Sequence, residues 1–194
     1  MVNTDAREGG ADSMNPPRAP IGQRIVVDGM TGAGKSTLSR ALAAKTRLPL
    51  IHLDLLYWKP GWSRPTPDEW SEKQREVLAG NAWIAEGNYP ETLPLRLERA
   101  DTIIVLDTPW WRCAARAFKR GLRRPTGTQM PDGCEDSAAQ RLGDEWRGAL
   151  KCWRNRQTEA THAVTMASQH GAHAHLYVLR SKQEARDFLA GLGE

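Results

Sequence analysis

The chain has 194 residues, of which 40% are hydrophobic and 26% are charged, with a formal net charge of +4 at pH 7. This length and composition predict one domain with a complete core. We find neither an apolar run long enough to span a membrane nor the apolar core of a signal peptide, so we expect a cytoplasmic protein with no membrane partner. The basic charge suits an anionic ligand, either a nucleotide or a nucleic acid.

The first 20 residues differ in character from the rest of the chain. They are polar, contain Pro16, Pro17 and Pro20, and show no periodicity, which predicts a disordered tail before a domain at 21–194. Cys113, Cys134 and Cys152 are far apart and match no zinc-binding spacing. We therefore expect free thiols in a reducing compartment.

Residues 24–45 predict a strand, a glycine-rich loop and a helix in succession. Residues 24–27 (Arg-Ile-Val-Val) form an apolar run typical of a buried parallel strand, and residues 37–45 are rich in helix formers. Between them, residues 29–36 read Gly-Met-Thr-Gly-Ala-Gly-Lys-Ser, which fits the phosphate-binding pattern G-x-x-x-x-G-K-S/T at every fixed position. Such a loop directs backbone N–H groups and a positive helix end at a polyphosphate.

Each residue of this loop has an expected role toward a nucleotide. Lys35 is expected to reach the β- and γ-phosphates, Ser36 to ligate Mg²⁺, and Thr37 to place a hydroxyl near the α-phosphate. The glycines let the backbone curve round the phosphates. The predicted nucleotide-binding residues here are Gly29, Thr31, Gly32, Ala33, Gly34, Lys35, Ser36 and Thr37.

Strands and helices continue to alternate after this unit. We expect strands at 49–53, 83–85, 101–107 and 175–179, and helices at about 66–80, 91–99, 109–124, 136–165 and from 182 onward. Thr66 and Glu69 form a capping box at the start of one helix, and residues 125–135, rich in glycine and proline, predict a loop or lid. The alternation predicts an α/β fold whose parallel sheet is covered by helices on both faces.

Carboxylates follow several predicted strands, at the sheet edge where ligands bind in such folds. Asp54 has three possible roles. It accepts the proton of a substrate hydroxyl that receives a phosphoryl group, or it only orients that substrate, or it bonds local N–H groups. Glu86 is either a magnesium-binding residue or a solvent-facing loop residue. Asp107 precedes Thr108-Pro109, and a helix-capping role explains it better.

A basic helix is expected after Pro109, and its spacing places several cations on one face: Arg112, Arg116, Lys119, Arg120, Arg123 and Arg124. An anion opposite this face would relieve the repulsion, and the alternative is a solvated basic surface. Arg96 is a candidate for binding an acceptor phosphate. Among the aromatic residues we expect packing roles for most of the cluster Tyr57, Trp58 and Trp62, and for Trp70, Trp110, Trp111, Trp146 and Trp153.

Taken in order, these motifs resemble the P-loop nucleoside monophosphate kinases. They are more closely similar to the adenylate-kinase-related proteins called DNA topology modulation or FlaR-like proteins. The resemblance spans about residues 24–190 and is carried by GMTGAGKST at 29–37, HLDLLYWKPGW at 52–62, WIAEGNY at 83–89, ADTIIVLD at 100–107, the arginine-rich helix and GCE at 133–135.

The resemblance implies a three-layer P-loop NTPase fold with a five-stranded parallel sheet in the order 2-3-1-4-5. It also implies an acceptor-binding segment at 55–82, a short lid at 121–136, and transfer of the γ-phosphoryl group of ATP, with Mg²⁺, to a small acceptor such as a nucleoside monophosphate. Arg116 and Arg120 match arginines that stack on the base and contact phosphates, and Glu86 matches an Asp that holds Mg²⁺ through water. The candidate catalytic residues are Lys35, Asp54, Glu86, Arg116 and Arg120, with Ser36 and Glu86 at the metal.

Other functions stay open at this point. A nucleotide-dependent nucleic-acid-binding regulator fits the family label, although no helix-turn-helix or RNA-binding motif is found. A kinase for a sugar or a shikimate-type acid would use Asp54 on an alcohol. A GTPase is disfavoured because the guanine-reading motif N-K-x-D is missing. Both a monomer and a homodimer are compatible with the sequence.

Overall fold

The computed structural model describes residues 21–122, 146–148, 150, 152–154 and 159–192, without the side chains of residues 120–122. The predictions for the tail at 1–20, for lid residues 123–136 and for the side chain of Arg120 lie outside the described residues. Within the described part, no helix is both long enough and apolar enough to cross a bilayer.

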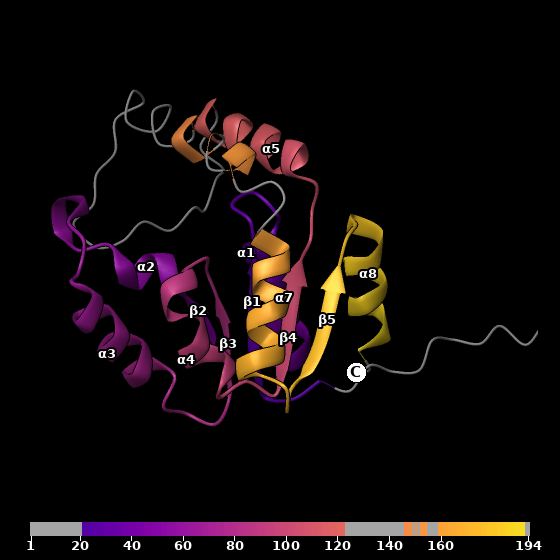
Figure 1. The fold of residues 1–194 in the computed structure, drawn as a ribbon. Coiled ribbons are helices and arrows are strands. Elements are labelled where there is room, and N and C mark those ends of the chain that lie inside the picture. Colours follow the sequence, from indigo (N-terminus) through magenta and orange to yellow (C-terminus); the bar gives the residue numbers. More distant parts are fainter. Residues whose placement is uncertain (1–20, 123–145, 149, 151, 155–158, 193–194) are drawn as a thin grey trace, which may run out of the picture.

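A five-stranded parallel sheet forms the centre of the molecule (Figure 1). Its strands are β1 (Arg24–Gly29), β2 (Leu50–His52), β3 (Trp83–Glu86), β4 (Thr102–Leu106) and β5 (His175–Leu179), and they lie in the order β2-β3-β1-β4-β5. The predicted sheet and its strand order are confirmed. Because β1 is central, the loop that follows it lies beside the carboxyl ends of β3 and β4.

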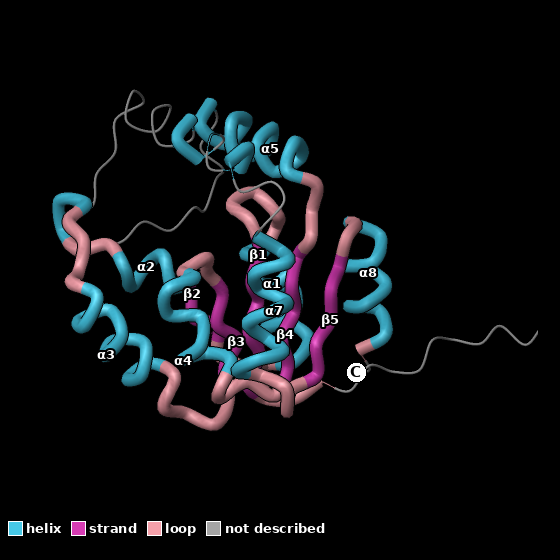
Figure 2. Tube along the Cα trace, in the orientation of Figure 1, coloured by secondary structure: helices cyan, strands magenta, loops and turns pink. Residues whose placement is uncertain are grey.

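Helices cover both faces of the sheet (Figure 2). Helices α1 (Lys35–Thr46) and α8 (Lys182–Gly191) pack on one face, and α4 (Leu93–Leu97) and α7 (Glu159–His170) pack on the other, with α3 (Pro67–Val77) beside α4. Helix α5 (Trp110–Leu122) lies above the carboxyl ends of the strands. The short helix α2 (Leu53–Tyr57) and the 3-10 turns η1 (Pro60–Trp62) and η2 (Pro90–Thr92) follow β2 and β3.

Alternate residues of β1 pack into two separate cores, because successive side chains of a strand face opposite sides. Ile25 and Val27 lie in a cluster with residues of α1 and α8, and Val26 lies in a cluster with residues of α4 and α7. All three are at most 1% exposed. Burial on both faces explains why this strand reads as a continuous apolar run.

Two helices have bounds that differ from those expected. Residues 91–99 form η2 and the short α4, because Pro90 and Pro94 each stand at the first turn of a separate element. The sequence predicts a helix at 136–165. Of these residues, the described ones at 146–148, 150 and 152–154 are helical, and α7 begins at Glu159 and ends five residues later than expected, at His170, directly before Gly171.

The packing roles expected for Trp70 and Trp110 are confirmed, and those expected for Trp111, Trp146 and Trp153 are wrong. Trp70 is 5% exposed, whereas Trp111, Trp146 and Trp153 are 54%, 59% and 51% exposed. On α5 the buried stripe is made by the small residues Cys113 and Ala117, four positions apart. Trp111 therefore falls on the opposite side of this helix.

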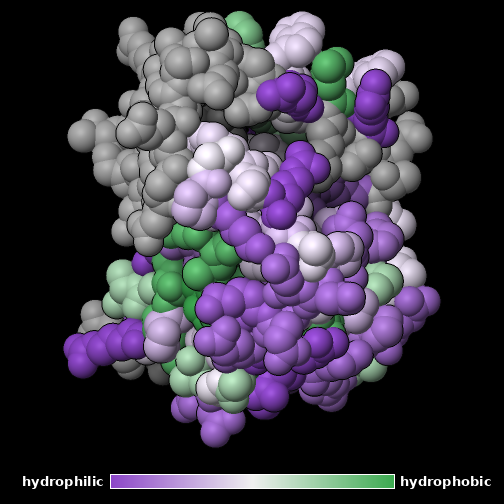
Figure 3. Space-filling view, turned by 90° about the vertical axis from the view of Figure 1, so that its left-hand side faces the viewer, coloured by the Kyte–Doolittle hydropathy of each residue, from purple (hydrophilic) through white to green (hydrophobic). Residues whose placement is uncertain are grey.

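Helix α3 begins with the capping box predicted from the sequence. The Glu69 N–H donates to Thr66 Oγ1 at 3.3 Å, and the Thr66 N–H donates to the Glu69 carboxylate at 2.8 Å. Trp70 and Gln74, one turn apart, are the buried residues of the helix. Its outer surface is hydrophilic (Figure 3), and exposed Lys73–Glu76 and Arg75–Glu72 pairs lie there.

Replacing Thr66 with Ala is expected to lower the free energy of unfolding by about 1 kcal/mol, because the Glu69 N–H loses its acceptor at the helix start. Urea unfolding measured by circular dichroism checks this value. Thr66→Ser keeps the hydroxyl and is the matched control. Equal stability of the Ala and Ser variants would contradict the role of the cap.

Candidate active site

The loop between β1 and α1 depends on glycine at several positions. Gly29, Gly32 and Gly34 have φ angles of 139°, 82° and 109°, where a side chain is disfavoured. A Cβ on Gly32 would lie 2.4 Å from the carbonyl oxygen of Cys113, and one on Gly29 would lie 2.7 Å from that of Leu106. The loop is therefore tightly fitted against β4 and α5 as well as sharply bent.

The N–H groups of this loop are available to a ligand. Helix α1 begins at Lys35, so the donors of its first turn have no acceptor one turn earlier within the helix. Among the described residues, no acceptor is found for the N–H groups of Gly34, Lys35 and Ser36. These donors, together with the positive end of the helix dipole, suit a phosphate group.

The ammonium group of Lys35 lies within the curve of the loop. Its Nζ donates to the carbonyl oxygens of Gly29 at 2.7 Å and Met30 at 3.2 Å, and the residue is 9% exposed. An ammonium group has three N–H donors. Because two of them are used, Lys35 keeps one donor for a bound anion.

Ser36 is hydrogen-bonded to a carboxylate from the neighbouring strand. The Ser36 hydroxyl donates to Glu86 Oε1 at 3.1 Å, and the same oxygen lies 2.6 Å from His52 Nδ1. Glu86 ends β3, and its side chain projects to the side of the sheet that α1 covers, as Ile84 does two residues earlier. In the β2–β3 register His52 is paired directly with Glu86, so two adjacent strand ends meet the start of α1.

Glu86 is held as a buried anion. Its burial would raise the pKa of the carboxyl, but the hydrogen bond with His52 and the positive charge of Lys35 outweigh this effect and leave the pKa below its ordinary value. The charged form therefore stabilises the fold above the ordinary pKa of a glutamate, and this contribution is lost as the pH falls through the lowered value. A buried, ionised carboxylate beside a hydroxyl is an oxygen pair suited to Mg²⁺.

A cavity of about 350 Å³ lies beside the phosphate loop. It is lined by two loop residues, by residues of the segment 54–64, and by the residues that follow β3: Thr31, Lys35, Asp54, Tyr57, Trp58, Arg64, Asn88, Tyr89, Pro90 and Glu91. This volume is in the range of small-molecule sites. Lys35 and Asp54 thus line one cavity, although they come from different strand ends.

Asp54 is oriented by a tyrosine that the sequence analysis did not single out. The Tyr89 hydroxyl donates to Asp54 Oδ1 at 2.7 Å, and burial and the Asp54 charge raise the Tyr89 pKa far above its ordinary value, so the phenol stays protonated. The Tyr89 ring lies 4.8 Å from that of Tyr57 and 4.9 Å from that of Trp70, between ring centroids. The ring contacts hold Tyr89 in place, so its hydroxyl stays directed at Asp54.

Arg96 does not fit the predicted role of binding an acceptor phosphate. It is 1% exposed, and its guanidinium donates to Gln74 Oε1 at 3.1 Å and to the Tyr89 carbonyl at 3.3 Å. Burial of the guanidinium lowers the Arg96 pKa, and the charge of Asp28, which is itself 6% exposed, opposes part of this effect. Arg96 is therefore part of the core beneath the cavity, because its helix α4 packs between α3 and α7.

Helix α5 is attached to the outside of the phosphate loop. Arg116 Nη1 donates to the carbonyls of Gly32 at 3.2 Å and Ala33 at 3.0 Å, and Cys152 Sγ donates to the Thr31 carbonyl at 3.4 Å. Cys113 and Cys152 are both buried, and burial, followed by the proximity of Cys152, raises the Cys113 pKa to about 11. Arg116 thus contacts the loop itself, and contact with a nucleotide stays a prediction for Arg116 and Arg120.

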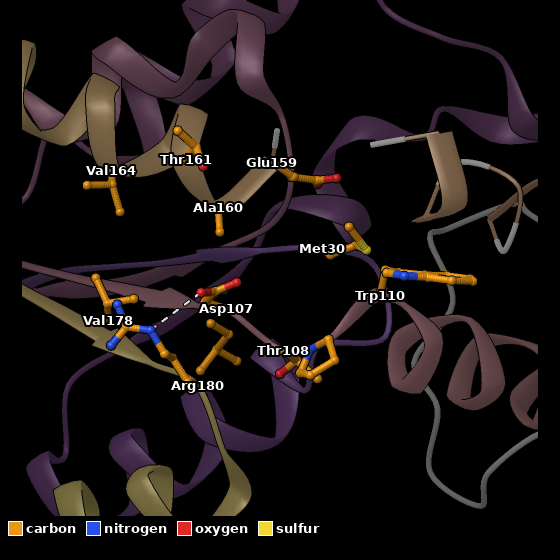
Figure 4. Close-up of a pocket in the computed structure, with 12 residues that line it drawn as sticks. Met30, Asp107, Thr108, Trp110, Glu159, Ala160, Thr161, Val164, Val178 and Arg180 are labelled. Carbon is orange, nitrogen blue, oxygen red and sulfur yellow. Dashed lines mark ion pairs between the residues drawn. The ribbon is translucent and has the colours of Figure 1, made fainter. Parts of the chain in front are cut away.

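A second cavity, of about 360 Å³, lies between α7 and the carboxyl ends of β4 and β5 (Figure 4). Asp107 and Arg180 lie side by side in its lining and form an ion pair, with 3.6 Å between carboxylate and guanidinium. No helix-capping hydrogen bond from the Asp107 side chain is found among the described residues, so the predicted capping role is wrong. Asp107 projects toward α7, as Val105 does, and this direction takes it away from the start of α5.

Comparisons with known proteins place the fold and leave the activity open. No protein family description matches the chain. A bifunctional pantoate ligase/cytidylate kinase from a Synechococcus strain is 31% identical over 86 residues, which are 43% of this chain, and the chain spans only 15% of the length of that relative. The shikimate kinase of Bacteroides thetaiotaomicron aligns over 88% of this chain and 96% of its own with a TM-score of 0.50 and 17% identity. A shikimate kinase from Acinetobacter baumannii, in complex with shikimate, aligns over 87% and 89% with a TM-score of 0.49 and 16% identity.

The tight fit of the phosphate loop can be measured by comparing two glycines. Gly61 has φ +70° with nothing near its Cβ position, whereas Gly32 has φ +82° and the Cys113 carbonyl at 2.4 Å. Gly61→Ala is expected to cost about 1–2 kcal/mol from the backbone conformation alone. Gly32→Ala is expected to lower the free energy of unfolding by about 1–3 kcal/mol more than this, because its Cβ would also displace α5.

Urea unfolding of the two variants checks this difference. Equal losses of stability would contradict the close approach of α5 to the loop.

Proposed function

We propose that this protein is a Mg²⁺- and ATP-dependent phosphotransferase that moves the γ-phosphoryl group of ATP to a small acceptor, either a nucleotide or related molecule or a small alcohol. The observation that carries the proposal is that one cavity is lined by both Lys35 and Asp54. Lys35 belongs to a loop suited to the β- and γ-phosphates, so an acceptor in this cavity lies next to the phosphoryl group to be transferred. Phosphoryl transfer is catalysed mainly by such positioning and by stabilisation of charge.

The residues beside the loop fit a magnesium ion. Among the described residues, no group of three or more His, Cys, Asp and Glu side chains forms a metal site. Ser36 would hold the ion directly and Glu86 through water, together with phosphate oxygens, which is how Mg²⁺ is commonly bound in nucleotide sites. A bound ion supplies positive charge to the phosphates during transfer. His52 keeps the Glu86 carboxylate in place as an outer partner.

The protein's own groups account for binding of the donor phosphates. The free N–H groups of Gly34, Lys35 and Ser36 donate to phosphate oxygens, and the Lys35 ammonium adds a positive charge at the end of the cavity. Arg116 and Arg120 are proposed to contact the nucleotide from α5. In this assignment Thr31, Ala33 and Thr37 line the path of the triphosphate.

The main experiment measures ADP release by purified protein with Mg·ATP over nucleoside monophosphates, nucleosides and small alcohols. Lys35→Ala is expected to lower kcat/KM by about 10²–10³-fold, because charge stabilisation at the transferred group is lost. Lys45→Ala, at the other end of α1, is the matched control and is expected to stay active. Normal turnover by Lys35→Ala would contradict the proposal.

The same protein distinguishes the alternative of a nucleic-acid-binding regulator. That function predicts DNA binding, measured by fluorescence anisotropy, that weakens steeply with salt. It also predicts no phosphorylated product from any acceptor. Both results together would replace the kinase proposal.

Glu86→Gln is expected to raise the Mg²⁺ concentration needed for half-maximal activity by about 10–100-fold, because the metal site loses its negative charge. Glu86→Asp keeps the charge on a shorter arm and is expected to lie between the Gln variant and the natural protein. Titration of activity with Mg²⁺ at saturating ATP measures both. An unchanged titration for Glu86→Gln would remove Glu86 from the metal site.

A further inference from the structure

We propose that the acceptor is an uncharged, polyhydroxylated small molecule without a phosphate group, such as a sugar or a polyol, and that Asp54 receives the proton of the hydroxyl that is phosphorylated. This inference rests on the proposed phosphotransferase function and specifies its acceptor. It is carried by the cavity of about 350 Å³ between Lys35 and Asp54, by the burial of Arg96, and by the hydrogen bond that orients Asp54.

The acceptor end of this cavity is not positively charged. Its described lining contains two carboxylates, Asp54 and Glu91, against one guanidinium, Arg64. Lys35 is the remaining cation of the lining, and its ammonium is already bonded to loop carbonyls at the donor end. Lys35 and Arg64 together only balance the charges of Asp54 and Glu91, and in the proposed function Lys35 is already used by the phosphates of ATP, so the described lining has no excess positive charge for a second phosphate group.

Arg96, the candidate for binding an acceptor phosphate, is held in the core and does not reach this cavity. Arg96 is 1% exposed and donates to Gln74 and to the Tyr89 carbonyl. To reach an acceptor it would leave Gln74 Oε1 without this donor and Asp28 without its nearby positive charge. Removing one partner from buried polar groups is costly, so Arg96 stays in place beneath the cavity.

Asp54 is oriented so that one carboxylate oxygen can accept a hydrogen bond from an alcohol. Tyr89 donates to Asp54 Oδ1, which leaves Oδ2 to accept from an acceptor hydroxyl. A nucleotide phosphate is already a nucleophile at neutral pH and needs no such base, whereas an alcohol must lose a proton. The oriented carboxylate therefore has a use with an alcohol that it lacks with a phosphate acceptor.

The rest of the lining suits several hydroxyl groups. Each hydroxyl both donates and accepts, and the cavity offers acceptors on Asp54 and Glu91 and donors on Arg64 and Asn88. The Arg64 guanidinium lies 5.4 Å from the centre of the Trp58 ring, and this stacking leaves its N–H groups free to donate at the edge. Tyr57 and Trp58 add apolar ring surface beside these polar groups.

The proposed step involves only ATP, the acceptor hydroxyl and Asp54 as reacting groups. The acceptor oxygen forms a bond to the γ-phosphorus as the bond from that phosphorus to the β,γ-bridging oxygen breaks. The electron pair of the broken bond leaves with ADP, and the hydroxyl proton passes to Asp54 Oδ2. The charged loop and Lys35 stabilise the phosphates while this occurs.

The experiment compares kcat/KM for three acceptor classes with Mg·ATP: neutral sugars and polyols, hydroxy acids, and nucleoside monophosphates. The phosphorylated product is identified by mass spectrometry. We expect at least one neutral polyhydroxylated acceptor to exceed every member of the other classes by tenfold or more. Faster turnover of a nucleoside monophosphate or a hydroxy acid would overturn the inference.

Two variants then test Asp54 with the acceptor that reacts best. Asp54→Asn is expected to lower kcat by about 10²–10⁴-fold while Mg·ATP binding, measured by calorimetry, is unchanged. Tyr89→Phe is expected to lower kcat less, because Asp54 remains but loses its orienting donor. Arg75→Ala, an exposed α3 arginine outside the cavity, is the matched control. Undiminished kcat for Asp54→Asn would overturn the assignment of the base.

The failure of this inference is distinguishable from failure of the proposed function. Phosphorylation of a nucleoside monophosphate that depends on Lys35 would refute only the acceptor class. Absence of Lys35-dependent Mg·ATP binding would refute the phosphotransferase itself.

Discussion

The buried carboxylate of Glu86 is the point at which the candidate site is held together. It accepts from Ser36 at the start of α1 and contacts His52 at the end of β2, and the charge of Lys35 favours its ionised form. A buried anion requires such partners, because without them burial would neutralise it. The strand order places β3 between β2 and β1, so these partners converge on one carboxylate. The start of α1, the end of β2 and the proposed magnesium site thus meet at this carboxylate.

A second buried charge supports the other side of the cavity. Arg96 links Gln74 of α3 to the carbonyl of Tyr89, and Tyr89 in turn donates to Asp54. Helices α3 and α4 therefore contribute to the acceptor side of the site without lining it. In a buried hydrogen-bonded network of this kind, each group restricts the arrangement of its neighbours. The orientation of Asp54 thus depends on Tyr89, whose backbone is bonded in turn by Arg96 beneath the cavity.

The phosphate loop is also constrained from outside. Gly32 leaves room for the Cys113 carbonyl, and Arg116 bonds two carbonyls on the outer side of the loop, so α5 and the loop are fitted to one another. The buried stripe of α5 is made of small residues, which permits this close approach. The N–H groups on the inner side of the loop stay available to an anion. The loop is therefore bonded to α5 through its carbonyl groups, while N–H groups of Gly34, Lys35 and Ser36 remain for a ligand.

The sequence alone determined the order of strands and helices, the phosphate loop, and the carboxylates at the strand ends, because these depend on local patterns of apolar residues, glycine spacing and helix caps. The strand order came from the resemblance to the P-loop kinases. The sequence did not identify His52 as a partner of Glu86 or Tyr89 as a partner of Asp54. It also predicted, wrongly, that Arg96 binds an acceptor phosphate and that Asp107 caps a helix. Those errors have one cause: alternation along a strand and packing between helices decide where a side chain points, and both depend on neighbours distant in sequence. Only the tertiary structure paired His52 with Glu86, buried Arg96 under the cavity and joined Lys35 and Asp54 in one cavity.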